Sequence, residues 1–402
     1  MGSWPDGHDR REPSVSWSPT SGFNEDQIAL KQSAKAFAER ELMPHMDDWE
    51  RAGEVPREIQ KKVAQAGLLA VGFPERVGGD GGNLFDNLAL QEGFMEAGVS
   101  GGALTAIFTH GIALPHIARN GSQELIDTWV KPTLAGDLIG SLGITEPGAG
   151  SDVAGITTRA VRDGDEWVIN GAKMFISSSV RGDFVTVACR TADTGAHGIS
   201  LIVVPKGTPG YTVSRKLDKM GWLASDTGEL SFVDVRVPIT NLVGQENHGF
   251  YYIADQFVTE RIGLALQGYG HAIRCLNLTA EYVAQRTAFG KPLNANQVVR
   301  AKLVEMRRQT EVARTYTLEV ARRYAAGESV VAEACMAKQT AVEAGCWVAD
   351  AAVQLHGGMG YMRETEVERH YRDVRLLPIG GGATEVLTDL AARLLGYAPD
   401  KK

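Results

Sequence analysis

Residues 167–176 read WVINGAKMFI and carry the clearest strand signal in the chain. Two apolar runs flank Asn170-Gly171, and this dipeptide favours a tight turn because both central positions of a type I′ turn need positive φ. The pattern therefore predicts a β-hairpin whose turn is Asn170-Gly171. Further short apolar runs at 184–188, 199–204 and 230–237 predict more strands. The middle of the chain is thus expected to be an antiparallel β domain.

The N-terminal part has helical signals instead. Asn24 with Gln27 three residues later has the form of a capping box, and Pro44 ends the run of apolar residues that follows. A second helix is expected between Pro56 and Gly67. Helical patterns continue to about residue 134, so these residues predict a separate helical domain.

The C-terminal third contains almost no proline. Only three of the 15 prolines follow Pro238, and residues 293–377 contain none. Because proline is the strongest helix breaker, this region is expected to form long helices, one of them over 332–355 and ended by Gly357. The fold class is therefore α+β and mainly α. The expected parts are a disordered leader (1–21), an N-terminal helical domain (22–137), a β domain (138–245) and a C-terminal helical domain (246–402).

Composition excludes several classes of protein. The 41 basic and 49 acidic residues give a net charge of −8, which offers no basic surface for nucleic acid. No run of 18 apolar residues and no secretory signal occurs, so we expect no membrane span and a cytoplasmic location. The four cysteines are scattered without C-x-x-C spacing, so neither disulfides nor a structural metal site are expected. Rossmann, P-loop and zincin fingerprints are also absent.

Residues 143–152, GITEPGAGSD, form the segment richest in chemical groups. Its glycines and proline predict a loop whose backbone can approach a flat ligand, and Thr145 and Ser151 offer hydroxyl groups. Taken alone, the segment fits a tight β-domain loop equally well.

Three motifs resemble those of the acyl-CoA dehydrogenase family. The 143–152 loop is similar to the first family signature, and residues 354–361, QLHGGMGY, are similar to the second. Residues 286–292, RTAFGKP, followed by Gln297, resemble a third element. The resemblance spans about residues 23–397 in the same domain order. It implies that the C-terminal domain is a four-helix bundle and that the protein is an FAD flavoprotein of fatty acid β-oxidation.

The resemblance also implies a flavin site. One half of that site would surround the ring system, with Thr145 and Ser177 as hydrogen-bond donors that tune the flavin. The other half would come from a neighbouring subunit and hold the FAD pyrophosphate and adenosine, so a homotetramer is implied. The implied FAD residues are Leu142, Ile144, Thr145, Ser151, Phe175, Ile176, Ser177, Arg286, Phe289, Gln297, Gln354, Gly357, Gly358, Thr384 and Glu385.

The catalytic base is where this chain departs from much of the family. Many members carry a glutamate in the segment matching residues 379–385, but Gly381 stands there. Long-chain and isovaleryl types place the base on a helix of the C-terminal domain, in a position that Glu260 matches. We therefore expect Glu260 to take the α-proton. Glu385 is the alternative base. Ala383 also replaces a threonine that reaches FAD in most members, and Thr384 could substitute for it.

The surroundings of Glu260 look closest to the long-chain type. The resemblance implies substrate contacts from Ser151, Tyr251, Val258, Thr259, Arg261 and Gly382. The expected activity is the conversion of an acyl-CoA to its trans-2-enoyl-CoA, with an electron-transferring flavoprotein as acceptor. Two alternatives stay open: a flavin oxidase or monooxygenase of the same fold, and a catalytically silent FAD- or acyl-CoA-binding protein. Acyl chain length is also open.

Overall fold

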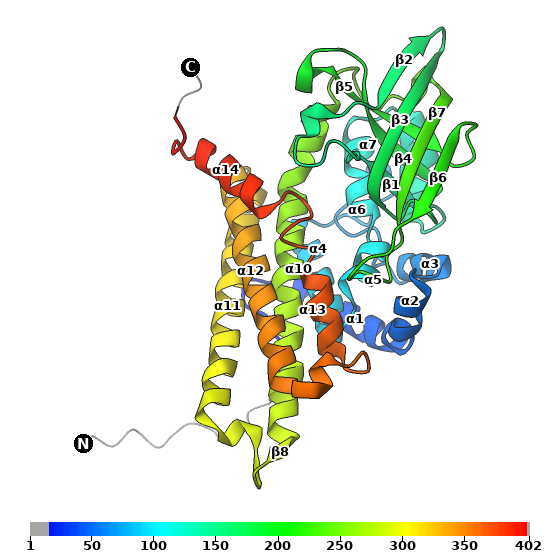
Figure 1. Ribbon diagram of the computed structural model, residues 1–402. Coiled ribbons are helices and arrows are strands. Elements are labelled where there is room, and N and C mark those ends of the chain that lie inside the picture. The colour runs from blue at the N-terminus through cyan, green and yellow to red at the C-terminus, as the bar shows by residue number, and fades with distance from the viewer. Residues whose placement is uncertain (1–15, 400–402) are drawn as a thin grey trace.

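The computed structural model describes residues 16–399, in which a sheet lies beside long C-terminal helices (Figure 1). The N-terminal helices are α1 (Glu25–Glu41), α2 (Met46–Ala52), α3 (Arg57–Gln65), α4 (Leu84–Ala97), α5 (Gly101–Ile107), α6 (His110–Ala113), α7 (Pro115–Asn120), α8 (Gln123–Leu125) and α9 (Lys131–Leu134). The predicted capping box is confirmed, because Asn24 Oδ1 accepts from Gln27 N and Gln27 Oε1 accepts from Asn24 N. The second predicted helix, α3, begins directly after Pro56.

The predicted leader is too long at its C-terminal end. Residues 1–15 lie outside the described residues, but residues 16–21 pack on the helices. Trp17 exchanges two backbone hydrogen bonds with the Asn277 side chain, and Lys31 Nζ donates to Pro19 O at 2.7 Å. The composition of this segment resembles that of a disordered one, yet the long helices offer partners for its backbone.

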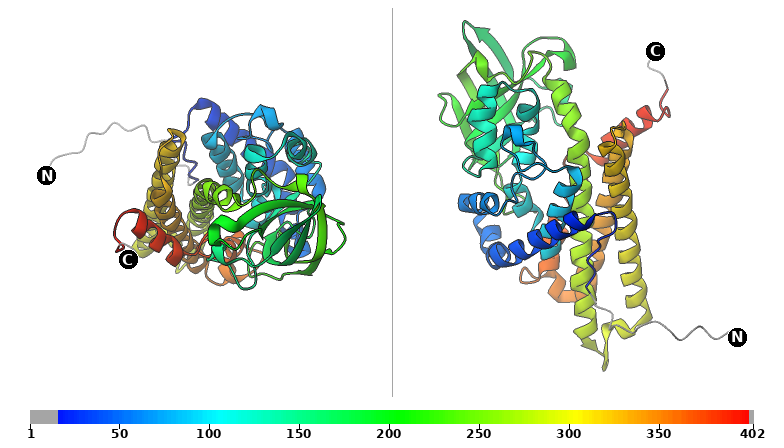
Figure 2. Two further views of the ribbon diagram at one scale, coloured as in Figure 1. Left: turned by 90° about the horizontal axis from the view of Figure 1, so that it is seen from above. Right: turned by 180° about the vertical axis from the view of Figure 1, so that it is seen from behind.

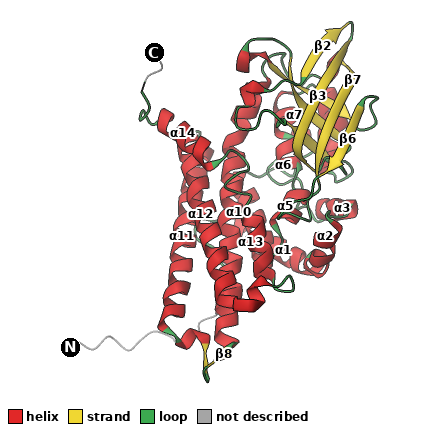
Figure 3. Ribbon diagram, viewed as in Figure 1, coloured by secondary structure: helices red, strands yellow, loops and turns green. Residues whose placement is uncertain are grey.

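The sheet gathers at one end of the molecule (Figure 3). Its strands are β1 (Gly140–Gly143), β2 (Arg159–Asp163), β3 (Glu166–Ser177), β4 (Phe184–Arg190), β5 (Ile199–Pro205), β6 (Tyr211–Lys216) and β7 (Thr227–Pro238), in the order β1-β4-β2-β3-β7-β6 with β5 beside β4. The antiparallel prediction holds for most pairs but not for all. β1 runs parallel to β4, and β2 is parallel to β4 at one residue pair. About 40 residues separate β1 from β4, so hairpin geometry does not govern how they pair.

The predicted Asn170-Gly171 turn is wrong. Both residues lie inside β3, where the register with β7 shifts between Ile169 and Gly171. A Cβ atom at position 171 would lie 2.6–2.8 Å from Thr158 atoms, so the glycine permits close packing of strands. The hairpin turn lies instead at Gly164, between β2 and β3.

The C-terminal helices are α10 (Gly249–Gln285), α11 (Gln297–Ala325), α12 (Val331–His356), α13 (Glu366–Val374) and α14 (Thr384–Leu394). The first three are long and run side by side (Figure 2), which confirms the proline-free prediction. α13 packs on α10 and α12 as the fourth member of the bundle, and α14 packs on α12 as a fifth helix. The small strands β8 (Thr287–Ala288) and β9 (Lys291–Pro292) form a hairpin after α10.

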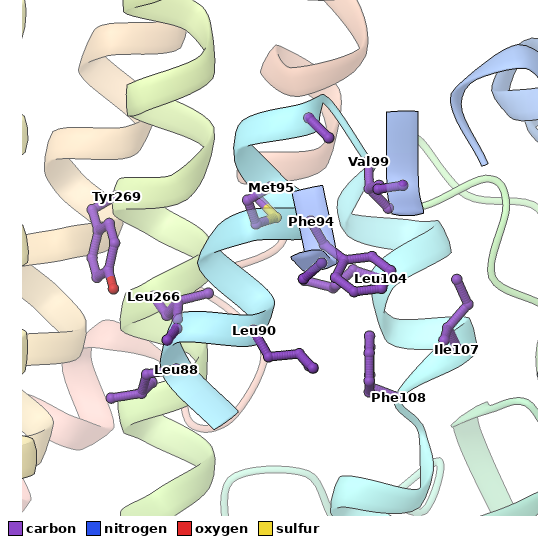
Figure 4. Close-up of a cluster of buried hydrophobic side chains, with 14 of the residues drawn as sticks. Leu88, Leu90, Phe94, Met95, Val99, Leu104, Ile107, Phe108, Leu266 and Tyr269 are labelled. Carbon is purple, nitrogen blue, oxygen red and sulfur yellow. The ribbon is translucent and has the colours of Figure 1, made fainter. Parts of the chain in front are cut away.

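A shared core fixes α10 against the N-terminal helices. Leu90 and Phe94 of α4 and Leu266 of α10 are fully buried in one hydrophobic cluster (Figure 4). The buried Glu92 carboxylate adds polar links, because it accepts hydrogen bonds from Lys31, Tyr269 and Arg314 at 2.8–3.0 Å. These contacts join four helices and hold α10 in place.

The sheet is joined to the helices through Asp373 of α13. Its carboxylate accepts hydrogen bonds from Trp222 N in the loop between β6 and β7 and from Gly101 N at the start of α5. One buried side chain therefore links all three parts of the chain.

Candidate functional site

Glu260 lies on α10 with a partly buried side chain. Burial raises the pKa of its carboxyl to about 6, although the positive charges of Arg261 and Lys338 act in the opposite direction. No side chain within residues 16–399 hydrogen-bonds this carboxyl. A carboxyl with these properties can accept a proton from a ligand near neutral pH.

Gly381 faces Glu260, as expected from the exchanged position of the base. A Cβ atom built on Gly381 would lie 3.5 Å from Glu260 Oε1 and only 2.1 Å from Leu264 Cδ1. Gly381 also has φ +64°, a conformation that favours glycine. Two residues 121 positions apart in the sequence therefore meet at one place.

The residues around Gly381 form a turn held by a buried lysine. Lys338 Nζ donates to the carbonyls of Gly380 and Gly382 at 2.9 and 2.8 Å. Thr384 begins α14 just beyond the turn, and its hydroxyl donates to Pro378 O at 3.3 Å. Glu385 is exposed on the first turn of α14. The Thr384 hydroxyl is thus partly engaged within the protein.

The loop that begins with β1 meets β3 beside α10. Met174 N donates to Thr145 O at 2.8 Å, and Ile144, Ala149 and Phe257 of α10 share one hydrophobic cluster. Leu142 and Ser177 are partly buried, Ile176 is buried and Ser151 is exposed. Ile144 of this loop therefore lies beside α10, whereas the Ile176 side chain packs in the interior of the β domain.

These residues fit a flat aromatic ligand. The hydroxyls of Thr145 and Ser177 have no hydrogen-bond partner among residues 16–399, and both residues are partly accessible. Cβ atoms at Gly148 and Gly150 would meet nothing within 4 Å, so this loop presents its backbone to open space. Phe175 is 61% exposed beside them at φ +64°. Free donors, bare backbone and an exposed aromatic ring match what the isoalloxazine of FAD requires.

Lys173 and Glu146 are site residues that the sequence analysis missed. Lys173 Nζ is buried and donates to Ile144 O at 2.9 Å and to Glu146 Oε1 at 2.8 Å. Glu146 also accepts from Thr157 and Thr158. Burial alone would raise the pKa of Glu146, but the Lys173 ammonium and these hydrogen bonds lower it to about 2. The ion pair anchors the loop from beneath, and a lysine within the apolar β3 segment was its only sequence signal.

The remaining predicted FAD residues lie at the opposite end of the long helices, near β8 (Figure 1). Tyr282 near the end of α10 stacks on His356 at the end of α12, with ring centroids 4.2 Å apart. The exposed residues of this end include Arg286, Phe289, Gln297, Gln354, Gly357 and Gly358. Phe289 is fully exposed at φ +52°.

One chain cannot bring both groups to the same ligand. Glu260 lies within α10 and Arg286 directly follows the end of that helix. The two residues are 26 positions apart, which at about 1.5 Å per residue is about 39 Å. Arg286 and the other predicted FAD residues near β8 lie at one end of the long helices. They are separated from the loop beside Glu260.

The predicted substrate residues have mixed surroundings. Val258 is buried in the core shared with the N-terminal helices. Residues two apart on a helix point about 200° apart, so Val258 and Glu260 face nearly opposite sides. The Thr259 hydroxyl donates to Gln256 O within its own helix.

The other four predicted substrate residues lie in more open or less fully bonded surroundings. Arg261 is buried with its guanidinium 5.4 Å from the centre of the Phe257 ring, and its Nε has no partner among residues 16–399. Tyr251 is half exposed, and its hydroxyl is 2.7 Å from His197 Nδ1. Gly382 adjoins Gly381 in the turn that faces Glu260. Ser151 lies on the exposed side of the flavin-type loop.

Within residues 16–399 no helix combines the length and apolar character needed to cross a membrane. No group of three His, Cys, Asp or Glu side chains in this range is arranged to hold a metal ion.

Comparisons with known proteins give consistent results. Models of the acyl-CoA dehydrogenase N-terminal, middle and C-terminal domains match residues 24–137, 141–235 and 247–396. The mitochondrial long-chain specific acyl-CoA dehydrogenase of Sus scrofa is 39% identical over 374 residues, which cover 92% of this chain and 86% of that protein. A Mycobacterium smegmatis structure assigned to an acyl-CoA dehydrogenase is 56% identical with a TM-score of 0.93, covering 94% of this chain and 100% of that one. A glutaryl-CoA dehydrogenase from Mycobacterium smegmatis in complex with FADH2 is 26% identical with a TM-score of 0.85, covering 94% and 97%.

Proposed function

Because the chain belongs to the acyl-CoA dehydrogenase family, whose cofactor is FAD, we propose that it oxidises an acyl-CoA thioester to the trans-2-enoyl-CoA with Glu260 as the base. The observation that carries this assignment is the unpaired Glu260 carboxyl facing Gly381, where no competing carboxylate stands. A pKa of about 6 leaves most of the Glu260 carboxyls ionised at pH 7.

The reaction removes one proton and one hydride from neighbouring carbons. Glu260 takes the proton from the α-carbon, and the bound FAD supplies the acceptor for the β-hydride. Negative charge develops on the thioester oxygen as the proton leaves, so hydrogen-bond donors near that oxygen would lower the barrier. Thr145 and Ser177 would orient the cofactor ring, while the Lys173 and Glu146 pair holds the loop that carries Thr145.

We further propose that two copies of the chain share each FAD site, within a homotetramer. The 39 Å separation along α10 supports this, because Arg286, Phe289 and Gln297 would reach the cofactor of a neighbouring subunit. A fully exposed phenylalanine at positive φ is also costly in an isolated chain, whereas a partner surface would bury it. An electron-transferring flavoprotein as acceptor and a cytoplasmic location stay predictions from the sequence.

Anaerobic mixing of the FAD-loaded protein with a panel of acyl-CoA thioesters tests the function. Long straight-chain, medium-chain and branched thioesters should bleach the visible flavin absorption band to different extents and so identify the substrate. Glu260→Gln should keep FAD but slow bleaching by about 10²–10⁴-fold, the usual contribution of a general base.

Glu385→Gln is the matched control, because it removes a nearby exposed carboxylate. Normal bleaching by Glu260→Gln, or loss of bleaching by the control alone, would assign the base elsewhere. Rapid oxygen consumption without an added acceptor would point to an oxidase, and no bleaching by any thioester to a silent binding protein.

A further inference from the structure

Lys338 of α12 is a fully buried lysine beside the proposed base. Its ammonium forms no salt bridge with any residue in 16–399 and instead donates to the carbonyls of Gly380 and Gly382. Burying a charged group is costly unless specific hydrogen bonds compensate. The two carbonyl bonds therefore tie the charge to one backbone turn.

The two bonds bracket Gly381. Both Gly381 and Gly382 have positive φ, so this turn is not maintained by helix or strand pairing. With a carbonyl fixed on each side, the Cα of Gly381 is held opposite Glu260, where its Cβ would come within 3.5 Å of Oε1. The lysine thus determines the shape of the wall that faces the carboxyl.

The same ammonium acts on Glu260 through space. The charged groups that bear on the Glu260 carboxyl are Arg261 on its own helix and Lys338 on α12, and both favour the ionised form. Burial and the positive charge of Arg261 lower the pKa of Lys338 to about 8, whereas Glu260 acts in the opposite direction and favours its protonated form. The thiol of Cys335, one turn before Lys338, also lies within the field of both cations.

We propose that Lys338 is a positioning residue for the dehydrogenation: it holds the turn at 380–382 opposite Glu260, and its positive charge favours the ionised carboxylate that accepts the proton. This inference rests on the proposed function of Glu260. Its test is therefore read on the carboxyl itself, without substrate.

Three substitutions test the charge of Lys338. Lys338→Gln keeps hydrogen-bond donors but loses the charge, Lys338→Met loses both, and Lys338→Arg keeps the charge. The pH midpoint of the Glu260 carboxyl is measured by infrared difference spectroscopy, with Glu260→Gln identifying the band. Lys31→Met is the matched control, because Lys31 is also buried but pairs with Glu92 and Glu96 among the N-terminal helices.

Both neutral variants should raise the Glu260 midpoint by about one pH unit, the lower end of the effect of a nearby charge. The acid limb of the rate of flavin bleaching should move with it, whereas Lys338→Arg and Lys31→Met should keep the wild-type midpoint. An unchanged midpoint in Lys338→Gln and Lys338→Met overturns the proposal. If neither neutral variant folds, Lys338→Arg decides, because a displaced midpoint in that variant contradicts the charge role and a wild-type midpoint upholds it.

The result is independent of the proposed activity. If no acyl-CoA reduces the wild-type protein, the proposed dehydrogenation is refuted, but the titration of the Glu260 carboxyl can still be measured. If the wild-type protein is reduced by acyl-CoA at a normal rate but the Glu260 midpoint stays unchanged in the neutral Lys338 variants, only the role of Lys338 is refuted.

Discussion

Replacing Gly381 by alanine measures how closely the C-terminal turn approaches α10. The added methyl would lie 2.1 Å from Leu264 Cδ1, far inside van der Waals contact, at a residue with φ +64°. Left-handed backbone costs a non-glycine residue about 1–2 kcal/mol. Overpacking of this kind costs about 1–3 kcal/mol. Gly381→Ala should therefore lower the free energy of unfolding by about 2–5 kcal/mol.

The steric part of this loss depends on one side chain. In a Leu264→Ala background the methyl has room, so Gly381→Ala should cost only the backbone part, about 1–2 kcal/mol. The two substitutions should thus show a coupling energy of about 1–3 kcal/mol. Urea unfolding of the four proteins at saturating FAD, followed by circular dichroism, gives the four free energies.

Gly263→Ala, next to Leu264 on α10, is the matched control, because a Cβ atom at Gly263 would meet nothing within 4 Å. It should stabilise the protein slightly, since alanine favours a helix over glycine by about 1 kcal/mol. Additive effects of Gly381→Ala and Leu264→Ala, within about 0.5 kcal/mol, would refute the contact. The same contact implies that a glutamate moved from position 260 to 381 would work better once Leu264 is shortened.

Three further predictions concern the base, the loop and the far end of the helices. The rate of FAD bleaching by acyl-CoA, measured by stopped flow, should fall about tenfold per pH unit below about pH 6, because only the ionised Glu260 accepts a proton. A bleaching rate that stays constant from pH 5 to 8 would contradict this. Lys173→Met should destabilise the protein by about 3–5 kcal/mol and weaken FAD retention, because it leaves the Glu146 charge buried without its partner. Unchanged FAD retention on gel filtration would show that this ion pair does not hold the loop. Phe289→Ser should lower both oligomer mass and FAD content in analytical ultracentrifugation. Val233→Ser, which also replaces an exposed apolar side chain by serine but on β7, should alter neither; equal effects of the two substitutions would exclude a special role for the hairpin.

Local signals predicted the helices well because their causes are local. The Asn24 and Gln27 side chains cap the helix between them, and the absence of proline permits the long helices wherever they pack. Gly357 ends α12 at φ +60°, as its position after the apolar run indicates. None of these features depends on distant residues.

Strand pairing was less predictable because distant residues decide it. Asn170-Gly171 has the composition of a turn, but Thr158 on the neighbouring segment needs the space beside Gly171, and the residues become a bulge. The Gly164 turn, flanked by two aspartates, carries a comparable signal. A single sequence does not indicate which of two such sites the sheet will use as its turn.

The sequence motifs predicted the site residues but not the buried lysines that hold the site loops. Resemblance to the family pointed to Glu260 and Gly381, and the structure places them face to face. Lys173 and Lys338 were not predicted, since a lysine in sequence is most often a solvated surface residue. Both are buried because each finds carbonyl oxygens on a loop that folds over it, and only the tertiary structure creates those acceptors. Glycines and buried lysines thus act together in these loops. The glycines in the motifs leave the loop backbone open toward the ligand, and the lysines hold that backbone from the protein side.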